Sequence, residues 1–376
     1  MSRVLVINPI LYTAETNQIP KVKSIKDTMI YTLCLGFLEN GHEVTLLAAQ
    51  DYKPLGEENY DFPVIWMETI WHKIFMPRCF PYMPKLRGYL KKHTEYDLII
   101  SSEMFSTWSY TATRVCPKKT IIWHELAKHN NMMHQIPSKV WHQIVVKFLM
   151  QKALIVPRSE AAAAFIGAFS KNISATIIDH GVNMTKLQNI LDITQPSQGK
   201  QNQFVVVSQL IERKQIDKTI QAFADFYKQG HCEYKLYIIG QGELEEELRK
   251  LVQKNQLEDV VIFCGRMNHE QLLPIVARSK ALLVSTRKDN NMVSITESIA
   301  VGTPVVTTTV PYNAAYIARE KLGVVADDWG VEALEEICEK NIMYIENCEK
   351  YRDKLSNVSC AEQFVTLGKE RSKDGK

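Results

Sequence analysis

The feature that most constrains the fold of this chain is a repeated alternation of short apolar runs with longer amphipathic stretches. Short runs with few polar positions are typical of strands buried on both faces of a parallel sheet. In the first half these runs are Val4–Asn8, Glu43–Ala48, Asp97–Ser101, Thr120–Trp123, Ala153–Val156 and Thr176–Ile178. A helix is expected between the first two, with Asp27 as its N-cap and Gly41 just beyond its end. We therefore predict a doubly wound α/β domain.

The same alternation restarts after a polar stretch at residues 194–203. The expected strands are Phe204–Val207, Lys235–Ile239, Val260–Phe263, Ala281–Val284 and Pro304–Thr308, and the helices between them are Gln215–Lys228, Leu244–Asn255, His269–Ala277 and Ser294–Val301. We predict two Rossmann-like domains, residues 1–182 and 183–348, and a C-terminal helix within 349–376 that returns to the first. Since open α/β sheets bind ligands beyond the carboxyl ends of their strands, the domains should face each other across a cleft.

Composition indicates a protein that is neither secreted nor membrane-spanning. Met1-Ser2-Arg3 leads directly into Val4–Ile7, which is too short for a signal peptide. No apolar run approaches the ~20 residues of a spanning helix. The eight scattered cysteines contain no Cys-x-x-Cys pair and suit reduced thiols. We therefore expect a cytoplasmic protein, which is peripheral on the inner face of the membrane if the basic segment described next binds lipid.

A basic, aromatic segment at residues 71–92 holds six basic residues and no acidic one, although the whole chain carries a net charge of only +3. Lysine and arginine favour anionic lipid, and aromatic side chains suit the membrane interface. The segment is predicted to dock on a membrane that carries a lipid-linked acceptor. The alternative is a solvated helix whose aromatic side chains enter the core. Nucleic acid is not an expected partner, because the net charge is small and no nucleic-acid motif occurs.

Two carboxylates, eight residues apart, stand out in the segment Asp289–Thr308. Asp289 lies in a polar turn after a strand, and Glu297 lies one turn into a helix that begins near Val293. Free N–H groups at a helix start bind phosphate, and carboxylates can bind sugar hydroxyls. Such a pair alone is more often a solvated loop and helix start. Together with the helix end and strand start at Gly302–Pro304, it predicts a site for a sugar nucleotide.

This segment resembles the acidic-x7-acidic motif of retaining glycosyltransferases with a GT-B fold, the large group 1 family that includes sucrose synthase and the phosphatidylinositol mannosyltransferases. By position, the resemblance implies that Glu297 binds the donor ribose and that Asp289 contacts the donor sugar. The family usually has a glutamate where this chain has Asp289. The resemblance also implies that the main-chain N–H groups of Asn291, Met292 and Val293 contact sugar or phosphate.

Shorter matches follow in the family's order: Gly41–Val44, His180–Asn183, Leu210–Lys214, Gly240–Gly242 and Phe263–Gly265. They extend the implied donor site to Gln209, Lys214, Gly240, Gly265, Arg266 and Met267. His124, which follows the strand Thr120–Trp123, matches a family histidine near the reacting centre. The residues expected to be catalytic are therefore His124, Asp289 and Glu297.

The resemblance implies a hexosyl-type glycosyltransferase that uses a UDP- or GDP-linked sugar and needs neither a metal nor another cofactor. Its acceptor would be a glycan or a lipid-linked acceptor, and transfer would retain the anomeric configuration, in surface polysaccharide or glycoconjugate synthesis. The chain departs from the family at Gln209, where an arginine is usual, so Lys214 becomes the main cation for the diphosphate unless Arg213, Arg287 or Lys288 compensates. Two other functions stay open: a nucleotide-sugar epimerase of the same fold, and a non-catalytic binding partner of another transferase.

Overall fold

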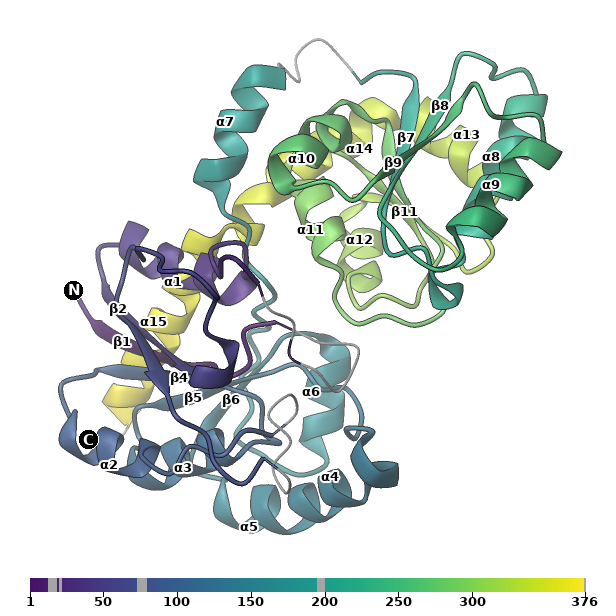
Figure 1. Cartoon of the computed structure of the whole chain (residues 1–376). Coiled ribbons are helices and arrows are strands. Elements are labelled where there is room, and N and C mark those ends of the chain that lie inside the picture. Colours follow the sequence, from purple (N-terminus) through teal and green to yellow (C-terminus); the bar gives the residue numbers. More distant parts are fainter. Residues whose placement is uncertain (13–18, 20–21, 73–79, 195–199, 375–376) are drawn as a thin grey trace. The chain divides into compact units, whose positions relative to one another are not determined.

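The computed structural model describes residues 1–12, 19, 22–72, 80–194 and 200–374, and the chain divides into two compact units (Figure 1). The first unit is Met1–Gly181 together with Asn357–Lys376, and the second is Val182–Ser356. The chain thus re-enters the first unit at Asn357, whereas residues 349–356, expected to belong to the returning helix, stay in the second unit.

The first unit is built on a parallel six-stranded sheet in the order β3-β2-β1-β4-β5-β6. The strands are β1 (Arg3–Ile7), β2 (Glu43–Ala49), β3 (Val64–Met67), β4 (Leu98–Ser102), β5 (Thr120–His124) and β6 (Leu154–Pro157). The helices are α1 (Met29–Glu39), α2 (Leu86–Lys92), α3 (Thr107–Val115), α4 (Ile136–Val140), α5 (Lys147–Leu149), α6 (Glu160–Gly167) and α15 (Asn357–Asp374). A π-helical stretch, η3 (Trp141–Val146), joins α4 to α5.

Helices cover both faces of this sheet, as the uninterrupted apolar runs predict. The side chains of α1 and α15 share one core with β1, β2 and β4, and those of α2 and α3 form a second core on the opposite face. The backbone at Asn357, where α15 begins, lies close to the backbones of Gly36 and Gly181. A Cβ on Gly36 of α1 would meet the carbonyl oxygen of Asn357 at 2.2 Å, and a Cβ on Gly181 would meet Cα of Asn357 at 2.7 Å. Glycine at these two positions is what allows the return.

Three expectations for this unit were wrong. Strand β3 has three partly exposed residues and was not expected. The segment Thr176–Ile178 is not a strand, because Ile178 makes isolated hydrogen bonds rather than a ladder. The N–H of Ile178 donates to the carbonyl of Pro157, and the carbonyl of Ile178 accepts from Nε1 of Trp123. Ile178 is apolar because it is buried in the core. The N-cap of α1 is Thr28 rather than Asp27, since Oγ1 of Thr28 accepts from the N–H of Tyr31.

The second unit repeats the architecture with the parallel order β12-β11-β10-β7-β8-β9. Its strands are β7 (Gln203–Val207), β8 (Lys235–Ile239), β9 (Val261–Gly265), β10 (Ala281–Val284), β11 (Val305–Thr307) and β12 (Gly323–Val325). Its helices are α7 (Met184–Thr194), α8 (Ile216–Lys228), α9 (Glu245–Lys254), α10 (His269–Arg278), α11 (Val293–Ala300), α12 (Ala314–Glu320), α13 (Val331–Glu339) and α14 (Asn341–Tyr351). All five expected strands are present within a residue or two of their expected bounds, and β12 was not expected.

Two cores lie on opposite faces of the second sheet. One includes side chains of α8, α9 and α13, and the other includes side chains of α10, α11 and α14. Both units are therefore doubly wound parallel α/β folds, the class that the sequence predicts. Among the described residues, no helix is long and apolar enough to span a membrane.

Candidate functional site

The predicted charged donor residues Lys214 and Asp289 lie beyond the carboxyl ends of β7 and β10, which are neighbours in the sheet. On one side of β7 the sheet continues with β8 and β9, and on the other side with β10, β11 and β12. The strand order therefore reverses between β7 and β10, and ligands of open α/β sheets bind at such a point. The loop after β7 carries Lys214, and the loop after β10 carries Asp289. Hydrogen bonds join the loops: Oγ1 of Thr286 and the N–H of Arg287 both donate to the carbonyl of Arg213, at 3.1 and 2.8 Å.

Asp289 is the centre of a charged cluster. Its Oδ2 lies 2.5 Å from Nζ of Lys214 and 3.1 Å from Nη1 of Arg213, and it accepts from Oγ1 of Thr286 at 3.0 Å. Lys214 is buried and Asp289 is largely so. Burial makes such charge-assisted bonds strong and an unpaired member costly. Two cations therefore hold one carboxylate in a fixed position.

Arg213 lies between Gln209 and Asp289. Nη2 of Arg213 lies 3.4 Å from Oε1 of the exposed Gln209, while Nη1 reaches Asp289 and the carbonyl of Lys288. The compensating cation considered from the sequence is thus present next to Lys214, and the cluster has two positive groups rather than one.

The glycine turn after β8 has a steric cause. Gly240 has φ +144°, and a Cβ there would lie 1.7 Å from the carbonyl oxygen of Ser208. A Cβ on Gly242 would lie 2.2 Å from the carbonyl oxygen of Leu210. Only glycine lets this turn pack directly on the loop after β7. The turn therefore supports the loop that carries Lys214 and Gln209.

Glu297 lies in the second turn of α11, whose first residue is Val293 as expected. Its Oε1 is 2.8 Å from Nε2 of His269, at the start of α10. His269 was not predicted, since it lies 28 residues from Glu297 along the chain and belongs to no motif. The N–H of Met292, expected to face sugar or phosphate, donates to Oδ1 of Asn313 at 2.6 Å, so this donor is already bonded within the unit.

The residues predicted to border the base lie at the end of β9. Gly265 has φ +66°, and its carbonyl accepts from the N–H of Gly240 at 2.8 Å. Arg266 is exposed, and Met267 is partly buried against a core of the unit. The structure therefore brings Gly240 and Gly265 together, next to the loop of Gln209 and Lys214.

In the first unit, His124 ends β5 and is fully buried. Its Nδ1 lies 3.0 Å from Oε2 of Glu103, the residue that follows β4. Glu103 has φ +64°, a conformation that costs energy outside glycine and that tends to occur at functional sites. Oε1 of Glu103 accepts from the N–H of Glu125 at 2.7 Å, so the carboxylate bridges the ends of β4 and β5.

The groups around Glu103 shift the pKa of its carboxyl group. Burial raises the pKa of Glu103, but His124, Arg158 and the N–H of Glu125 lower it by more, and the net shift of the pKa is downward. Arg158 also pairs with Glu125 at 2.9 Å, and its guanidinium stacks 3.6 Å above the ring of Trp123. His124 thus lies in a buried, charged network at the carboxyl edge of the sheet. Glu103 was missed by the sequence analysis because no motif marks it.

The basic segment at residues 71–92 lies only partly within the described residues, since 73–79 fall outside them. Of its described aromatic residues, Phe80 is buried, Trp71 stacks on Tyr82 at 5.2 Å, and Tyr89 contacts Tyr96 through their hydroxyls at 2.7 Å. Lys85 pairs with Glu68 at 2.6 Å. Phe80 and Tyr89 fit the alternative in which the aromatic side chains enter the core, whereas Trp71 is 58% exposed.

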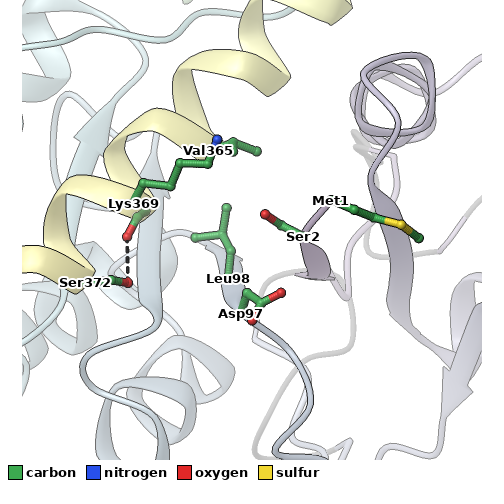
Figure 2. A pocket seen from close by; sticks show the side chains of 8 residues that line it. Met1, Ser2, Asp97, Leu98, Val365, Lys369 and Ser372 are labelled. Carbon is green, nitrogen blue, oxygen red and sulfur yellow. Dashed lines mark hydrogen bonds between the residues drawn. The ribbon is translucent and has the colours of Figure 1, made fainter.

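A pocket of about 470 Å³ lies at the opposite edge of the first sheet (Figure 2). It is lined by Ser2 and Asp97, at the amino ends of β1 and β4, and by Val365 and Lys369 of α15. Ligands of open parallel sheets bind at the other edge, so we assign it no part in the candidate site. Among the residues that the structure describes, no group of three or more His, Cys, Asp or Glu is placed to hold a metal ion.

Comparison with known proteins agrees with the doubly wound fold of both units. Residues 190–359 match the family described as "Glycosyl transferases group 1", and residues 27–186 match "Glycosyltransferase Family 4". The chain therefore carries a family 4 glycosyltransferase domain in its first half and a group 1 glycosyltransferase domain in its second, and it has the GT-B type of fold. It is a glycosyltransferase related to enzymes of surface polysaccharide and glycolipid synthesis.

Individual relatives are distant. The α-monoglucosyldiacylglycerol synthase of Streptococcus pneumoniae is 22% identical, over 81% of this chain and 72% of that protein. The lipopolysaccharide glucosyltransferase WaaG of Escherichia coli is 27% identical, over 45% of this chain and 46% of that one. Among solved structures, Anabaena HepE in complex with UDP superposes with a TM-score of 0.63 at 14% identity, covering 98% of this chain and 99% of that one. HepE has also been solved with UDP-glucose.

Proposed function

We propose that this enzyme transfers a hexose from a UDP- or GDP-linked sugar to a glycan or lipid-linked acceptor, with retention of the anomeric configuration and without a metal ion. The observation that carries the proposal is the cluster of Lys214, Arg213 and Asp289 at the switch point of the second sheet. Its two cations are suited to a diphosphate, and Glu297, at the start of the adjacent helix, is suited to ribose hydroxyls.

The names of the relatives support the choice of substrates. HepE was solved with UDP and UDP-glucose, and the two curated relatives are named for glucosyl transfer to diacylglycerol or lipopolysaccharide. The proposal therefore combines a nucleoside diphosphate sugar as donor, a membrane or surface glycoconjugate as acceptor, and a cytoplasmic site of action.

Catalysis is favoured over a purely binding role because Arg213 supplies the second cation that Gln209 does not. In the proposed roles, Lys214 and Arg213 stabilise the charge that develops on the leaving diphosphate. Asp289 contacts the donor sugar, and His124 lies on the reaction side, oriented by Glu103.

The test begins with a thermal-shift panel of UDP, GDP and their sugar derivatives. We expect stabilisation by one base class, and no stabilisation by any of them would overturn the donor site. The stabilising donor is then incubated with membrane glycolipid acceptors, and proton NMR of the product's anomeric centre reports retention or inversion. Activity that persists in EDTA supports metal independence, whereas loss restored by a divalent cation contradicts it.

Two other outcomes would replace the proposal. Isomerisation of the donor without acceptor would indicate an epimerase of this fold. Nucleotide binding with neither transfer nor hydrolysis, across the acceptor panel, would indicate a non-catalytic partner of another transferase.

A further inference from the structure

The helical segment Met132–Leu149 of the first unit has one buried face and, opposite it, an exposed apolar face. It comprises a 3-10 turn at Met132–Gln135, then α4, η3 and α5 (Figure 1). Every fourth residue on one side is buried beneath the segment: Ser138, His142, Val146 and Met150. The residues midway between these are Val140, Ile144 and Phe148, with Ile136 before them, and all four are exposed. One face thus packs on the unit, and the opposite apolar face does not.

The exposed face is a concentrated apolar surface. Fourteen large hydrophobic residues of the described chain are exposed, and six of them lie in this one segment. We call these six the ridge: Met133, Ile136, Val140, Ile144, Phe148 and Leu149. Phe148 and Met133 are 70% and 72% exposed. Single exposed apolar residues are ordinary, but a contiguous set on one helix marks an interaction surface.

The acidic and basic residues of the stretch that carries the ridge have one sign. From residue 126 to residue 159 the chain has no aspartate or glutamate. Lys128, Lys139, Lys147 and Lys152 are exposed in this stretch, and two of them lie on the segment itself. A second copy of the chain docked ridge to ridge would bring these lysines together with no acidic partner. An anionic surface is complementary to both the apolar ridge and its lysines.

We infer that the ridge docks into the headgroup region of an anionic phospholipid bilayer, with the helix in the plane of the membrane. Apolar side chains on one face and lysines beside them are what interfacial helices use, and bulky Phe, Ile and Met supply the buried area. The inference concerns the first unit alone and holds whether or not the proposed donor site is right. It places lipid contact in a different segment from residues 71–92, in which Phe80 and Tyr89 pack within the unit although Trp71 is 58% exposed.

The apolar part of the inference is tested by flotation of the full chain with vesicles of phosphatidylcholine, alone or mixed with phosphatidylglycerol. We expect binding to the mixed vesicles and a loss of about tenfold or more in partition coefficient for each of Ile144→Ser and Phe148→Ser. The matched control is Leu55→Ser with Ile342→Ser, which removes two residues of similar exposure elsewhere and should change nothing. Unchanged thermal unfolding shows that each variant is folded.

The charged part uses Lys139→Glu with Lys147→Glu. Binding to mixed vesicles should fall by about fivefold or more for each lysine and should weaken as salt rises. The control, Lys250→Glu with Lys254→Glu on α9, reverses two exposed lysines outside the segment and should bind like the parent chain.

Three results would overturn the inference. The first is equal vesicle binding by the ridge variants and the parent. The second is loss of binding only on reversal of Lys85, Arg87, Lys91 and Lys92, which would assign the membrane to the other segment. The third is concentration-dependent self-association that the ridge variants abolish, with no lipid binding by the parent, which would make the ridge a contact between copies.

Discussion

Nζ of Lys214 lies 2.5 Å from Oδ2 of Asp289, although 75 positions separate these residues along the chain. The cation expected to hold the donor diphosphate and the carboxylate expected to contact the sugar therefore form one ion pair, which Arg213 shares. A carboxylate held by two cations and a hydroxyl has little freedom to move. The site is thus ordered by its own charges, which reduces the conformational entropy lost on binding.

Replacing Lys214 should weaken diphosphate binding most. We expect Lys214→Ala to lower the affinity for the nucleoside diphosphate by about 10- to 100-fold, because a charge-assisted bond contributes about 1.5–3 kcal/mol. Isothermal titration measures it. Lys218→Ala, four residues on and exposed, is the control and should bind as the parent does. Equal affinities of both variants would remove Lys214 from the site.

Glu297 should contribute to ribose binding rather than to phosphate binding. Glu297→Gln is expected to lower nucleoside diphosphate affinity by about tenfold, while leaving binding of inorganic diphosphate unchanged. Lys214→Ala should weaken both ligands. The contrast, measured by competition titration, separates the two roles, and a parallel loss for both ligands in Glu297→Gln would contradict the ribose assignment. Glu320→Gln on α12 is a surface control.

Glu103 should act through His124. Glu103→Gln keeps an oxygen for the N–H of Glu125 but loses the charge beside the imidazole. We expect kcat to fall by about 10- to 100-fold with an unchanged KM for the donor, because a mispositioned group affects the reaction step. Steady-state kinetics measures the split. Glu95→Gln, which removes the carboxylate of the more exposed His93–Glu95 pair, should leave both constants unchanged.

The first unit should lose stability in mild acid. Burial lowers the pKa of His142 to about 4, below its ordinary value of 6.5. Between these pH values the unfolded chain takes up a proton that the folded chain does not, so stability falls as the pH drops from 6.5 towards 4. The loss is about 3 kcal/mol at most.

Urea unfolding at several pH values measures this effect. His142→Asn, whose Nδ2 can donate to the carbonyl of Ser138 as Nδ1 of His142 does, should flatten the acid side of the curve. His134→Asn, an exposed control on the same segment, should not. A parent stability that is constant between pH 6.5 and 4 would contradict the assignment.

Gly240 should tolerate no side chain. Gly240→Ala places a Cβ 1.7 Å from a carbonyl oxygen, and we expect the second unit to lose about 3 kcal/mol or more. Gly230→Ala is the matched control, since φ is also positive there but no atom lies within 4 Å of the added Cβ. It should cost about 1–2 kcal/mol from the backbone alone. Similar losses in the two variants, measured by thermal unfolding, would exclude the steric explanation.

Local pattern alone was enough to predict the doubly wound class and five of the six strands of the second unit. A strand buried on both faces must be apolar throughout, and this leaves a mark on the sequence that needs no tertiary knowledge. The same rule explains the errors. Thr176–Ile178 is apolar because Ile178 enters a core, and β3 was missed because three of its four residues are partly exposed.

The sequence by itself determined the two α/β units and the segments that carry Asp289, Glu297, Lys214 and His124, since these depend on local periodicity and motif order. Only the tertiary structure decided the partners of these residues: Arg213 for Asp289, His269 for Glu297 and Glu103 for His124. It also decided that the ridge faces outward, because an apolar helix has the same sequence whether its second face is covered or exposed. The reason is that contacts between distant segments depend on how strands are ordered in a sheet, and no short stretch of sequence encodes that order.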